Sequence, residues 1–377
     1  MHNKILLLSA YDASSHRLWR QRLLQLFPQL NWTQLVLPPR HFNWRIRGNS
    51  LQWATTELKT LNQPYDLLIV TSMVDLSSLR GFVPALSKIP TLIYFHENQF
   101  AYPAGEQHRE NIEHQLVPLY SALCADVVVF NSWFNRQTFL EGARSLIQRL
   151  PEKFPDSILD KLQDSQVIPV PIDTGPLKPD PKKDTDSDSI LEVIWNHRWE
   201  YDKGIELLLA LVKQVAAQQL PFRFHIVGEQ FRQQPQQFVE INQTLAEHGK
   251  RTGISQGSFG FVPERNDYLA LLQRCDVVLS TALHDFQGLA VQEAVAAGCT
   301  PLTPADLVYP EYLQPVFLFS RAPQQQATVQ HILGKLLAWQ HLKACHEKLP
   351  MAGLEHYSMD NVGQQYARLF ESMWLTD

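Results

Sequence analysis

Short apolar runs alternate with longer segments of helical periodicity along most of the chain. Each run is followed by polar or small residues, and then by apolar residues at the three- and four-residue spacing of a helix. Because strands that alternate with helices are typical of βαβ units, this order predicts parallel sheets with helices packed on their faces. The runs predicted to form strands are residues 4–9, 31–37, 67–71, 91–95 and 126–131 in the first half and 191–195, 222–227, 258–262, 276–280 and 300–302 in the second.

The composition of the chain changes between these two series of strands. Residues 169–173 contain two prolines, and residues 178–188 combine prolines with alternating acids, which is typical of a linker and a solvated loop. With 377 residues and 45% hydrophobic content, the chain is long enough to bury two cores. We therefore predict an α/β protein of two doubly wound domains, residues 1–172 and 191–355, with a linker and loop over 173–190.

Cysteines and apolar runs bear on where the protein works. The first apolar run, residues 5–8, is too short for a signal peptide, and no run reaches the length needed to span a bilayer. Four cysteines without C-x-x-C spacing are typical of buried free thiols in a reducing compartment. The sequence thus predicts a soluble cytoplasmic protein whose cysteines are Cys124, Cys275, Cys299 and Cys345, the first two in the core.

The alternating acids Asp184, Asp186 and Asp188 superficially suggest a metal site. They lack the glycine and the bidentate glutamate of a calcium-binding loop, so we expect no metal there.

Two cations lie where the run 191–195 gives way to a helical pattern. Arg198 follows the run, and Lys203 comes five residues later. A pair of cations at such a turn suits a diphosphate. Taken alone, both side chains could equally be solvated turn residues.

A second polar segment, residues 284–293, combines an acid, a turn glycine and a carboxylate in the first turn of a helix. These residues are Asp285, Gly288 and Glu293. Free N–H groups at the start of a helix bind phosphate, and neighbouring carboxylates bind hydroxyl groups. The two segments together predict a nucleotide-sugar site, whereas Glu293 alone could be an ordinary first-turn acid favoured by the helix dipole.

In this order the two segments resemble those of the retaining glycosyltransferases of family 4, which have the two-domain GT-B fold with a central cleft. The resemblance implies that Arg198 and Lys203 bind the donor diphosphate and stabilise the charge that develops on it during transfer. It also implies that no metal is needed, because the two cations take its place.

The same resemblance assigns roles in the second segment. Glu293 would bind the ribose hydroxyls, and the amides of Gly288 and Leu289 would bind phosphate or sugar. Asp285 stands where the family usually has glutamate, so it keeps the charge that would contact the transferred sugar but has a shorter reach. The loop after the predicted strand 258–262 looks like the one that contacts the donor base, through the backbone beside Val262, with Tyr268 either a base contact or part of the core.

Polar residues also follow the predicted strand 91–95, at the strand end where ligands of doubly wound sheets bind. They are His96, Glu97 and Asn98. In resembling enzymes a histidine near this place lies close to the transferred sugar, and Glu97 and Asn98 would bind the acceptor. A histidine packed inside the domain is the alternative, and Ser132 after the strand 126–131 is either a site residue or a helix N-cap.

Residues 13–56 contain no acid and six arginines: Arg17, Arg20, Arg22, Arg40, Arg45 and Arg47. A loop predicted over residues 40–47 adds Trp44, so that cations alternate with aromatic rings. Arginines can neutralise RNA phosphates, and the rings of Phe42, Trp44 and Trp53 offer stacking surfaces for unpaired bases. The alternatives are a solvated helix face with core aromatics, or a contact with an anionic membrane surface.

Finally, residues 41–47, 94–99, 127–132 and 284–286 together resemble the tRNA-queuosine α-mannosyltransferases. That resemblance implies GDP-mannose as donor, tRNA as acceptor and no further cofactor, and the family's C-terminal helix implies that residues 356–377 return to the first domain. The glycine-poor turn 9–15 and Asp285 depart from the family pattern. The alternatives are a glycosyltransferase of the same fold for a lipid or polysaccharide, and a non-catalytic RNA-binding protein.

Overall fold

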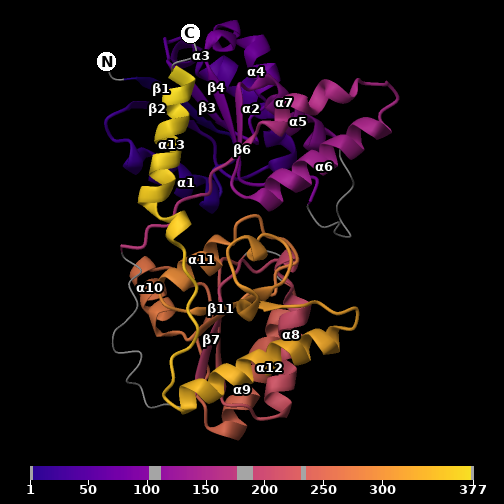
Figure 1. The fold of residues 1–377 in the computed structure, drawn as a ribbon, viewed down its shortest axis with the longest axis vertical. Coiled ribbons are helices and arrows are strands. Elements are labelled where there is room, and N and C mark those ends of the chain that lie inside the picture. The colour runs from indigo at the N-terminus through magenta and orange to yellow at the C-terminus, as the bar shows by residue number, and fades with distance from the viewer. Residues whose placement is uncertain (1–2, 102–111, 176–189, 231–234, 375–377) are drawn as a thin grey trace. The chain divides into compact units, whose positions relative to one another are not determined.

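A computed structural model describes residues 3–101, 112–175, 190–230 and 235–374, and these form two compact units (Figure 1). The first unit joins Met1–Pro171 to His356–Asp377, and the second is Ile172–Glu355. The expected acidic loop with Asp184, Asp186 and Asp188 lies outside the described residues.

The first unit is built on a parallel sheet of six strands in the order β2-β1-β3-β4-β5-β6. Strands β3 and β4 are buried along their whole length, because helices cover a parallel sheet on both faces. The strands are β1 (Lys4–Ser9), β2 (Asn31–Val36), β3 (Leu67–Thr71), β4 (Thr91–Phe95), β5 (Val127–Phe130) and β6 (Gln166–Val167).

The main helices of this unit are α1 (Ser14–Leu26), α2 (Phe42–Thr56), α3 (Leu58–Leu61), α4 (Leu76–Phe82), α5 (Glu113–Cys124), α6 (Trp133–Arg149), α7 (Asp160–Gln163) and the C-terminal α13 (Met359–Trp374). Short 3₁₀ turns lie at Pro84–Lys88 and Asp156–Leu159.

Helix α13 lies against α1 although the two are far apart in the sequence (Figure 1). The indole Nε1 of Trp19 donates to the hydroxyl of Tyr366 at 2.7 Å, and both side chains are buried. Tyr94 of β4 stacks on the same indole with ring centroids 4.4 Å apart. The C-terminal helix is thus part of the core of the first unit.

The second unit repeats the architecture with the strand order β12-β11-β10-β7-β8-β9. Its strands are β7 (Leu191–Trp195), β8 (Phe222–Val227), β9 (Phe259–Gly260), β10 (Val277–Leu279), β11 (Thr300–Pro304) and β12 (Leu318–Phe319). Its helices are α8 (Ile205–Ala217), α9 (Gln237–Thr252), α10 (Arg265–Arg274), α11 (Leu289–Ala296) and α12 (Gln325–Ala344), with 3₁₀ turns η4 (Tyr201–Lys203), η5 (Tyr309–Glu311) and η6 (Pro315–Phe317). The 3₁₀ turn η7 (Glu355–Tyr357) begins at the last residue of this unit and continues into the first.

The structure confirms the predicted fold class, two doubly wound parallel sheets, and differs in three local features. The pattern missed β6 and β12, because two residues are too few to show a periodicity. The expected loop 40–47 is wrong from Phe42 onward, since helix α2 begins there after His41, whose φ of 57° turns the chain. Cys345 is exposed, unlike the buried Cys275 and Cys299, and Cys124 is half-buried.

Among the described residues, no helix is both long and apolar enough to cross a membrane.

Candidate functional site

The cationic turn after β7 is held by contacts to the loop after β10. Lys203 is buried, and its Nζ donates to the backbone carbonyl of His284 at 2.8 Å and lies 3.2 Å from Oδ2 of Asp202. Thr281 accepts from the indole of Trp195 at 3.0 Å and donates to the carbonyl of Lys203 at 2.8 Å. The ammonium group is therefore fixed by the fold.

Gly204 makes this close approach possible. Its φ is 70°, and a Cβ there would lie 1.9 Å from the carbonyl oxygen of Thr281. Any side chain would push the two loops apart, so a glycine is required between the turn and helix α8.

Arg198 is the more accessible cation of the pair. Its side chain is 41% exposed, its Nη1 lies 3.1 Å from Oε2 of Glu200, and its Nη2 lies 4.0 Å from Asp202. Burial raises the pKa of Glu200, and the Arg198 charge opposes that shift. Two cations and two acids thus face one another, and Arg198 retains the exposure needed to meet an anionic ligand.

Asp285 is committed to the turn that precedes α11. Its Oδ1 accepts from the backbone N–H of Gly288 at 3.1 Å, and its Oδ2 accepts from the hydroxyl of Tyr309 at 3.0 Å. That hydroxyl also lies 2.8 Å from Oγ of Ser280. Desolvation alone would raise the pKa of Asp285, but the Lys203 charge and the Tyr309 hydroxyl lower it, which keeps the carboxylate ionised.

The sequence analysis missed Tyr309, which lies twenty-four residues from Asp285 in a short 3₁₀ turn. No local pattern marks it, because its role comes from contacts made through the fold.

Gly288 is the N-cap of α11 and has a φ of 73°. A Cβ there would lie 2.9 Å from the hydroxyl of Tyr312 and 3.0 Å from the ring of Tyr309. The first N–H groups of a helix have no partner within it, so the amides beginning at Leu289 are suited to hold an anion. The phosphate or sugar contact expected of the Gly288 amide is opposed by its hydrogen bond to Asp285, whereas the contact expected of the Leu289 amide stays a prediction.

Glu293 forms an ion pair that the sequence did not predict. Nη2 of Arg265 lies 2.7 Å from Oε1 of Glu293, and Nη1 lies 3.4 Å from Oε2. The guanidinium carbon is 5.4 Å from the ring centre of Tyr268. The Tyr268 hydroxyl accepts from Nδ2 of Asn196 at 2.9 Å, so the ring is held between Arg265 and Asn196. Its contact with the donor base stays a prediction.

Val262 is half-buried and follows β9, while the loop continues to the N-terminus of α10 at Arg265. The base contact predicted for Val262 stays a prediction.

In the first unit, His96 follows β4 and is buried. Its ring stacks on that of His16 with centroids 4.0 Å apart and contacts the edge of Trp19. None of the four ring nitrogens of the two histidines has a hydrogen-bond partner among the described residues. Burial lowers the pKa of His16 to about 4 and that of His96 well below its usual value, so both rings are neutral.

The structure places the neighbours of His96 differently from one another. Glu97 is half-buried, whereas Asn98 is buried and donates to Asn135 and Thr138 while accepting from the backbone of the next loop residues. This argues against the acceptor contact expected of Asn98, because its amide is already satisfied. Ser132 accepts from the backbone N–H of Asn135 at 3.0 Å and is the N-cap of α6.

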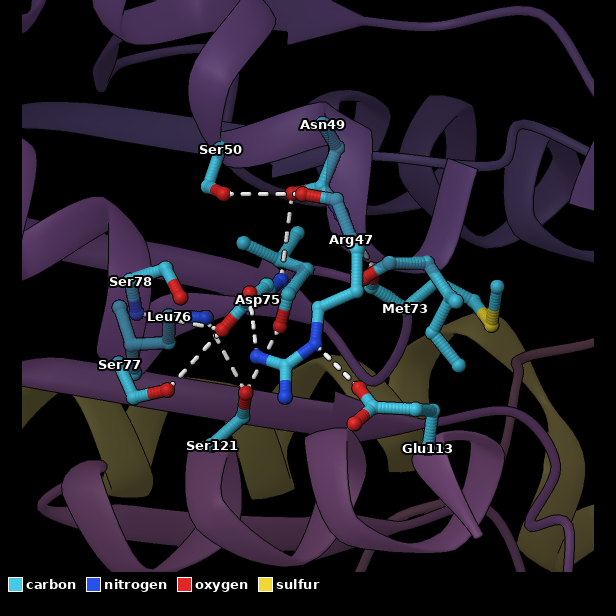
Figure 2. A network of polar contacts seen from close by, with 12 residues as sticks. Arg47, Asn49, Ser50, Met73, Asp75, Leu76, Ser77, Ser78, Glu113 and Ser121 are labelled. Atoms are coloured by element: carbon cyan, nitrogen blue, oxygen red, sulfur yellow. Dashed lines mark hydrogen bonds and ion pairs between the residues drawn. The ribbon is translucent and has the colours of Figure 1, made fainter. Parts of the chain in front are cut away.

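Acids from outside the basic stretch pair with three of its arginines. Asp12 lies 3.0 Å from Nη2 of Arg20 and 3.5 Å from Nε of Arg17. Figure 2 shows Arg47 between Asp75, at 3.1 Å, and Glu113. The expected positive field is therefore partly neutralised by Asp12, which directly precedes the stretch, and by Asp75 and Glu113, which are distant in sequence but close in the fold.

Two further arginines point inward. Arg22 donates to the carbonyl of Pro171, and Arg45 is buried and donates to Gln52 at 2.7 Å. A buried guanidinium cannot meet an RNA phosphate, so the structure argues against the acceptor role expected of Arg45. Trp53 is likewise a core residue, at 2% exposure.

Arg40 and Trp44 remain on the surface. Arg40 is exposed, and the Trp44 ring is 59% exposed while its inner face lies over Gly48, one turn along α2. A Cβ on Gly48 would lie 2.3 Å from that ring. The glycine thus lets the indole lie close against the helix with its outer face in water.

Among the residues whose placement is described, no three His, Cys, Asp or Glu side chains are arranged to hold a metal ion.

Comparison with known proteins places the chain in a family. It is 31% identical over 314 residues to the tRNA-queuosine alpha-mannosyltransferase of Drosophila melanogaster, covering 81% of each chain. The chain belongs to the tRNA-queuosine alpha-mannosyltransferase family. Residues 4–172 match the model of that family's N-terminal region, and residues 180–347 match that of the glycosyl transferases of group 1. A member of this family is a glycosyltransferase.

Solved structures of other proteins resemble this chain in fold. HepE of Anabaena, in complex with UDP and glucose, has a TM-score of 0.66 at 16% identity and covers 98% of this chain and 100% of its own. Sucrose-phosphate synthase from Thermosynechococcus elongatus has a TM-score of 0.68 at 14% identity, with all of both chains covered. The likeness confirms the GT-B fold class.

Proposed function

We propose that this chain transfers mannose from GDP-mannose to the queuosine nucleoside of tRNA, with retention of the anomeric configuration. The similarity to the Drosophila tRNA-queuosine alpha-mannosyltransferase carries this proposal, because it extends over 81% of both chains. The enzyme would work in the cytoplasm.

In the proposed reaction, the bond between mannose C1 and the diphosphate oxygen breaks, and a queuosine hydroxyl oxygen forms a new bond to C1 on the same face. Overall, the hydroxyl proton is replaced by the mannosyl group, and GDP is released with a proton. Negative charge develops on the departing diphosphate, so cations fixed beforehand lower the barrier.

The donor side of the proposal rests on the second unit. Lys203 is held by a carbonyl and a carboxylate, and the half-exposed Arg198 lies beside it on the same turn. Glu293 would bind the ribose hydroxyls, Val262 the base through its backbone, and the start of α11 the phosphate. Asp285 would shape that helix start and face the transferred sugar from there.

The acceptor side rests on the first unit. His96 is buried against His16, which favours the alternative of a histidine packed inside the domain over a contact with the sugar, and the half-buried Glu97 would be the hydrogen-bonding group of this loop. Arg40 and Trp44 are the exposed cation and ring of the basic stretch, and Arg47 is 41% exposed although two acids hold it. We propose these three for contacts with tRNA.

One experiment tests the proposed reaction directly. The protein is incubated with GDP-mannose, or with other nucleotide-sugars, and total tRNA, and the digested nucleosides are analysed by mass. We expect a hexose to be added to queuosine when GDP-mannose is the donor and not when another nucleotide-sugar is used. Transfer only to lipid or polysaccharide, or tRNA binding without transfer, would replace the proposal by one of the two alternatives raised by the sequence.

A further inference from the structure

We infer that Arg265 is a positioning residue for donor binding, which acts through Glu293 by holding that carboxylate for the ribose hydroxyls of the nucleotide. The inference rests on the proposed function in two respects: the second unit binds a nucleoside diphosphate, and Glu293 binds its ribose. It concerns the ribose, which all such donors share, so it does not depend on the base or the sugar.

The geometry of the pair is that of a fork. Two nitrogens of Arg265 each meet one oxygen of Glu293, at 2.7 Å and 3.4 Å. The Glu293 side chain is 12% exposed and the Arg265 side chain 53% exposed, so the pair has a buried and an open end. A two-point contact fixes the plane of the carboxylate as well as its distance.

A second set of contacts fixes Arg265 itself. Its guanidinium lies over the Tyr268 ring, and the hydroxyl of that ring accepts from Asn196, which follows β7. Asn196 also donates to the carbonyl of Ala290 at 2.8 Å, on the same helix as Glu293. The positions of Arg265 and Glu293 are therefore both fixed relative to the start of α11.

The ion pair leaves room for a ligand. Each carboxylate oxygen accepts two hydrogen bonds, so Glu293 can hold Arg265 and still accept from a pair of neighbouring hydroxyl groups. Without Arg265 the carboxylate would be free to rotate, and its charge would repel an anionic diphosphate nearby. Because Arg265 neutralises that charge, the same carboxylate serves the ribose without opposing the phosphates.

The test measures how much the ribose hydroxyls contribute to binding. For each variant, the dissociation constants of GDP and of 2′,3′-dideoxy-GDP are measured by calorimetry, and their ratio gives the ribose factor. We expect a factor of about tenfold or more for the unmodified protein, since lost hydrogen bonds to a charged group weaken binding by that order. Arg265→Ala should bring the factor close to that of Glu293→Gln, and Arg265→Lys should retain part of it.

A matched control separates the effect from general loss of charge. Arg251 pairs with Glu247 on the exposed face of α9, at 3.4 Å. Arg251→Ala removes the same charge from an arginine-glutamate pair in the same unit and should leave the ribose factor unchanged. Thermal unfolding of each variant shows whether the fold is kept.

A double variant tests the route of the effect. In a protein that already carries Glu293→Gln, Arg265→Ala should cause no further fall in the ribose factor, because its partner is gone. An undiminished factor in Arg265→Ala, or an equal fall in both backgrounds, would overturn the inference.

Repeating the ratio with UDP and its dideoxy analogue keeps this result separate from the proposed donor. If UDP binds and GDP does not, the proposed donor is wrong, and the inference stands or falls on the UDP ratio. An unmodified protein whose ribose factor is one with both nucleotides would overturn the inference.

Discussion

Two cations with unlike surroundings serve the same diphosphate in the proposed site. Lys203 is buried and bonded, whereas Arg198 is 41% exposed. We expect Arg198→Ala to lower the rate of mannosyl transfer by about a hundredfold with little change in thermal stability, because it removes a contact to developing charge. Lys203→Ala should cost as much activity and also some stability, since the buried Asp202 then loses the nearer of its two cations.

The control for this prediction is Lys213, an exposed residue of α8 that pairs with Glu240. Lys213→Ala should transfer mannose at the normal rate. Near-normal rates in both Arg198→Ala and Lys203→Ala would contradict the donor site. A chelator should not slow transfer, because the cations stand in place of a metal.

The buried histidines make stability depend on pH. His16 has its pKa lowered from 6.5 to about 4 in the folded state, because burial disfavours its charged form. Between those two values the unfolded chain binds more protons than the folded one. The stability that His16 contributes is therefore present above pH 6.5 and is lost as the pH falls toward 4.

The measurement is the free energy of unfolding in urea at pH 7.5 and pH 5. His16→Phe keeps a ring to stack on His96 and should reduce the loss of stability between the two pH values by about 2 kcal/mol. An equal loss in the variant and the original protein would show that His16 is not held neutral by the fold.

At the scale of elements, helix α2 carries a surface ring whose position depends on a glycine. Gly48→Ala would force the Trp44 ring away from the helix, since its Cβ would lie 2.3 Å from the indole. Alanine favours a helix interior over glycine by about 1 kcal/mol, and the ring has open water to move into. We expect the variant to be at least as stable as the original protein and to bind tRNA more weakly.

Trp44→Ala provides the comparison for that result. It should weaken tRNA binding by about 1–3 kcal/mol if the ring stacks on an unpaired base, with no loss of thermal stability, because the ring is 59% exposed. Normal tRNA affinity in both variants would remove α2 from the acceptor surface. GDP affinity, measured in parallel, should not change in either protein.

At the scale of the whole molecule, the chain ends in the unit where it began. Helix α13 buries one face against the first unit, including Val362, Tyr366, Leu369, Phe370 and Met373. Burial of each such side chain is worth about 1.5–3 kcal/mol, so a chain that stops after Glu355 should have a first unit of low stability. Calorimetry should show two unfolding transitions. That of the first unit should occur at a much lower temperature, and that of the second unit should still shift to a higher temperature when GDP is added.

If the first unfolding transition of the truncated chain occurs at the same temperature as in the full chain, α13 is dispensable for the stability of the first unit. The milder Tyr366→Phe variant removes the hydroxyl that accepts from Trp19 and interacts with Tyr94, and it should cost about 1 kcal/mol.

Local patterns in the sequence predicted elements well where burial is uniform. The strands at residues 4–9, 67–71, 91–95, 191–195 and 222–227 have the predicted ends, because each is a compact apolar run inside a parallel sheet. A turn between a strand and a helix is also a local feature of the sequence. The pattern therefore predicted the glycines at 204 and 288 and the cations beside the first of them.

Partners across the fold were decided only by the tertiary structure. Arg20 meets Asp12, Arg47 meets Asp75 and Glu113, and Arg265 meets Glu293, yet no spacing in the sequence links the members of the last two pairs. Whether a stretch without acids is neutral or positively charged depends on which acidic side chains the fold places beside it. Composition and periodicity determine which segments form strands and helices, whereas the charge, burial and reach of a side chain depend on contacts between segments that only the folded chain brings together.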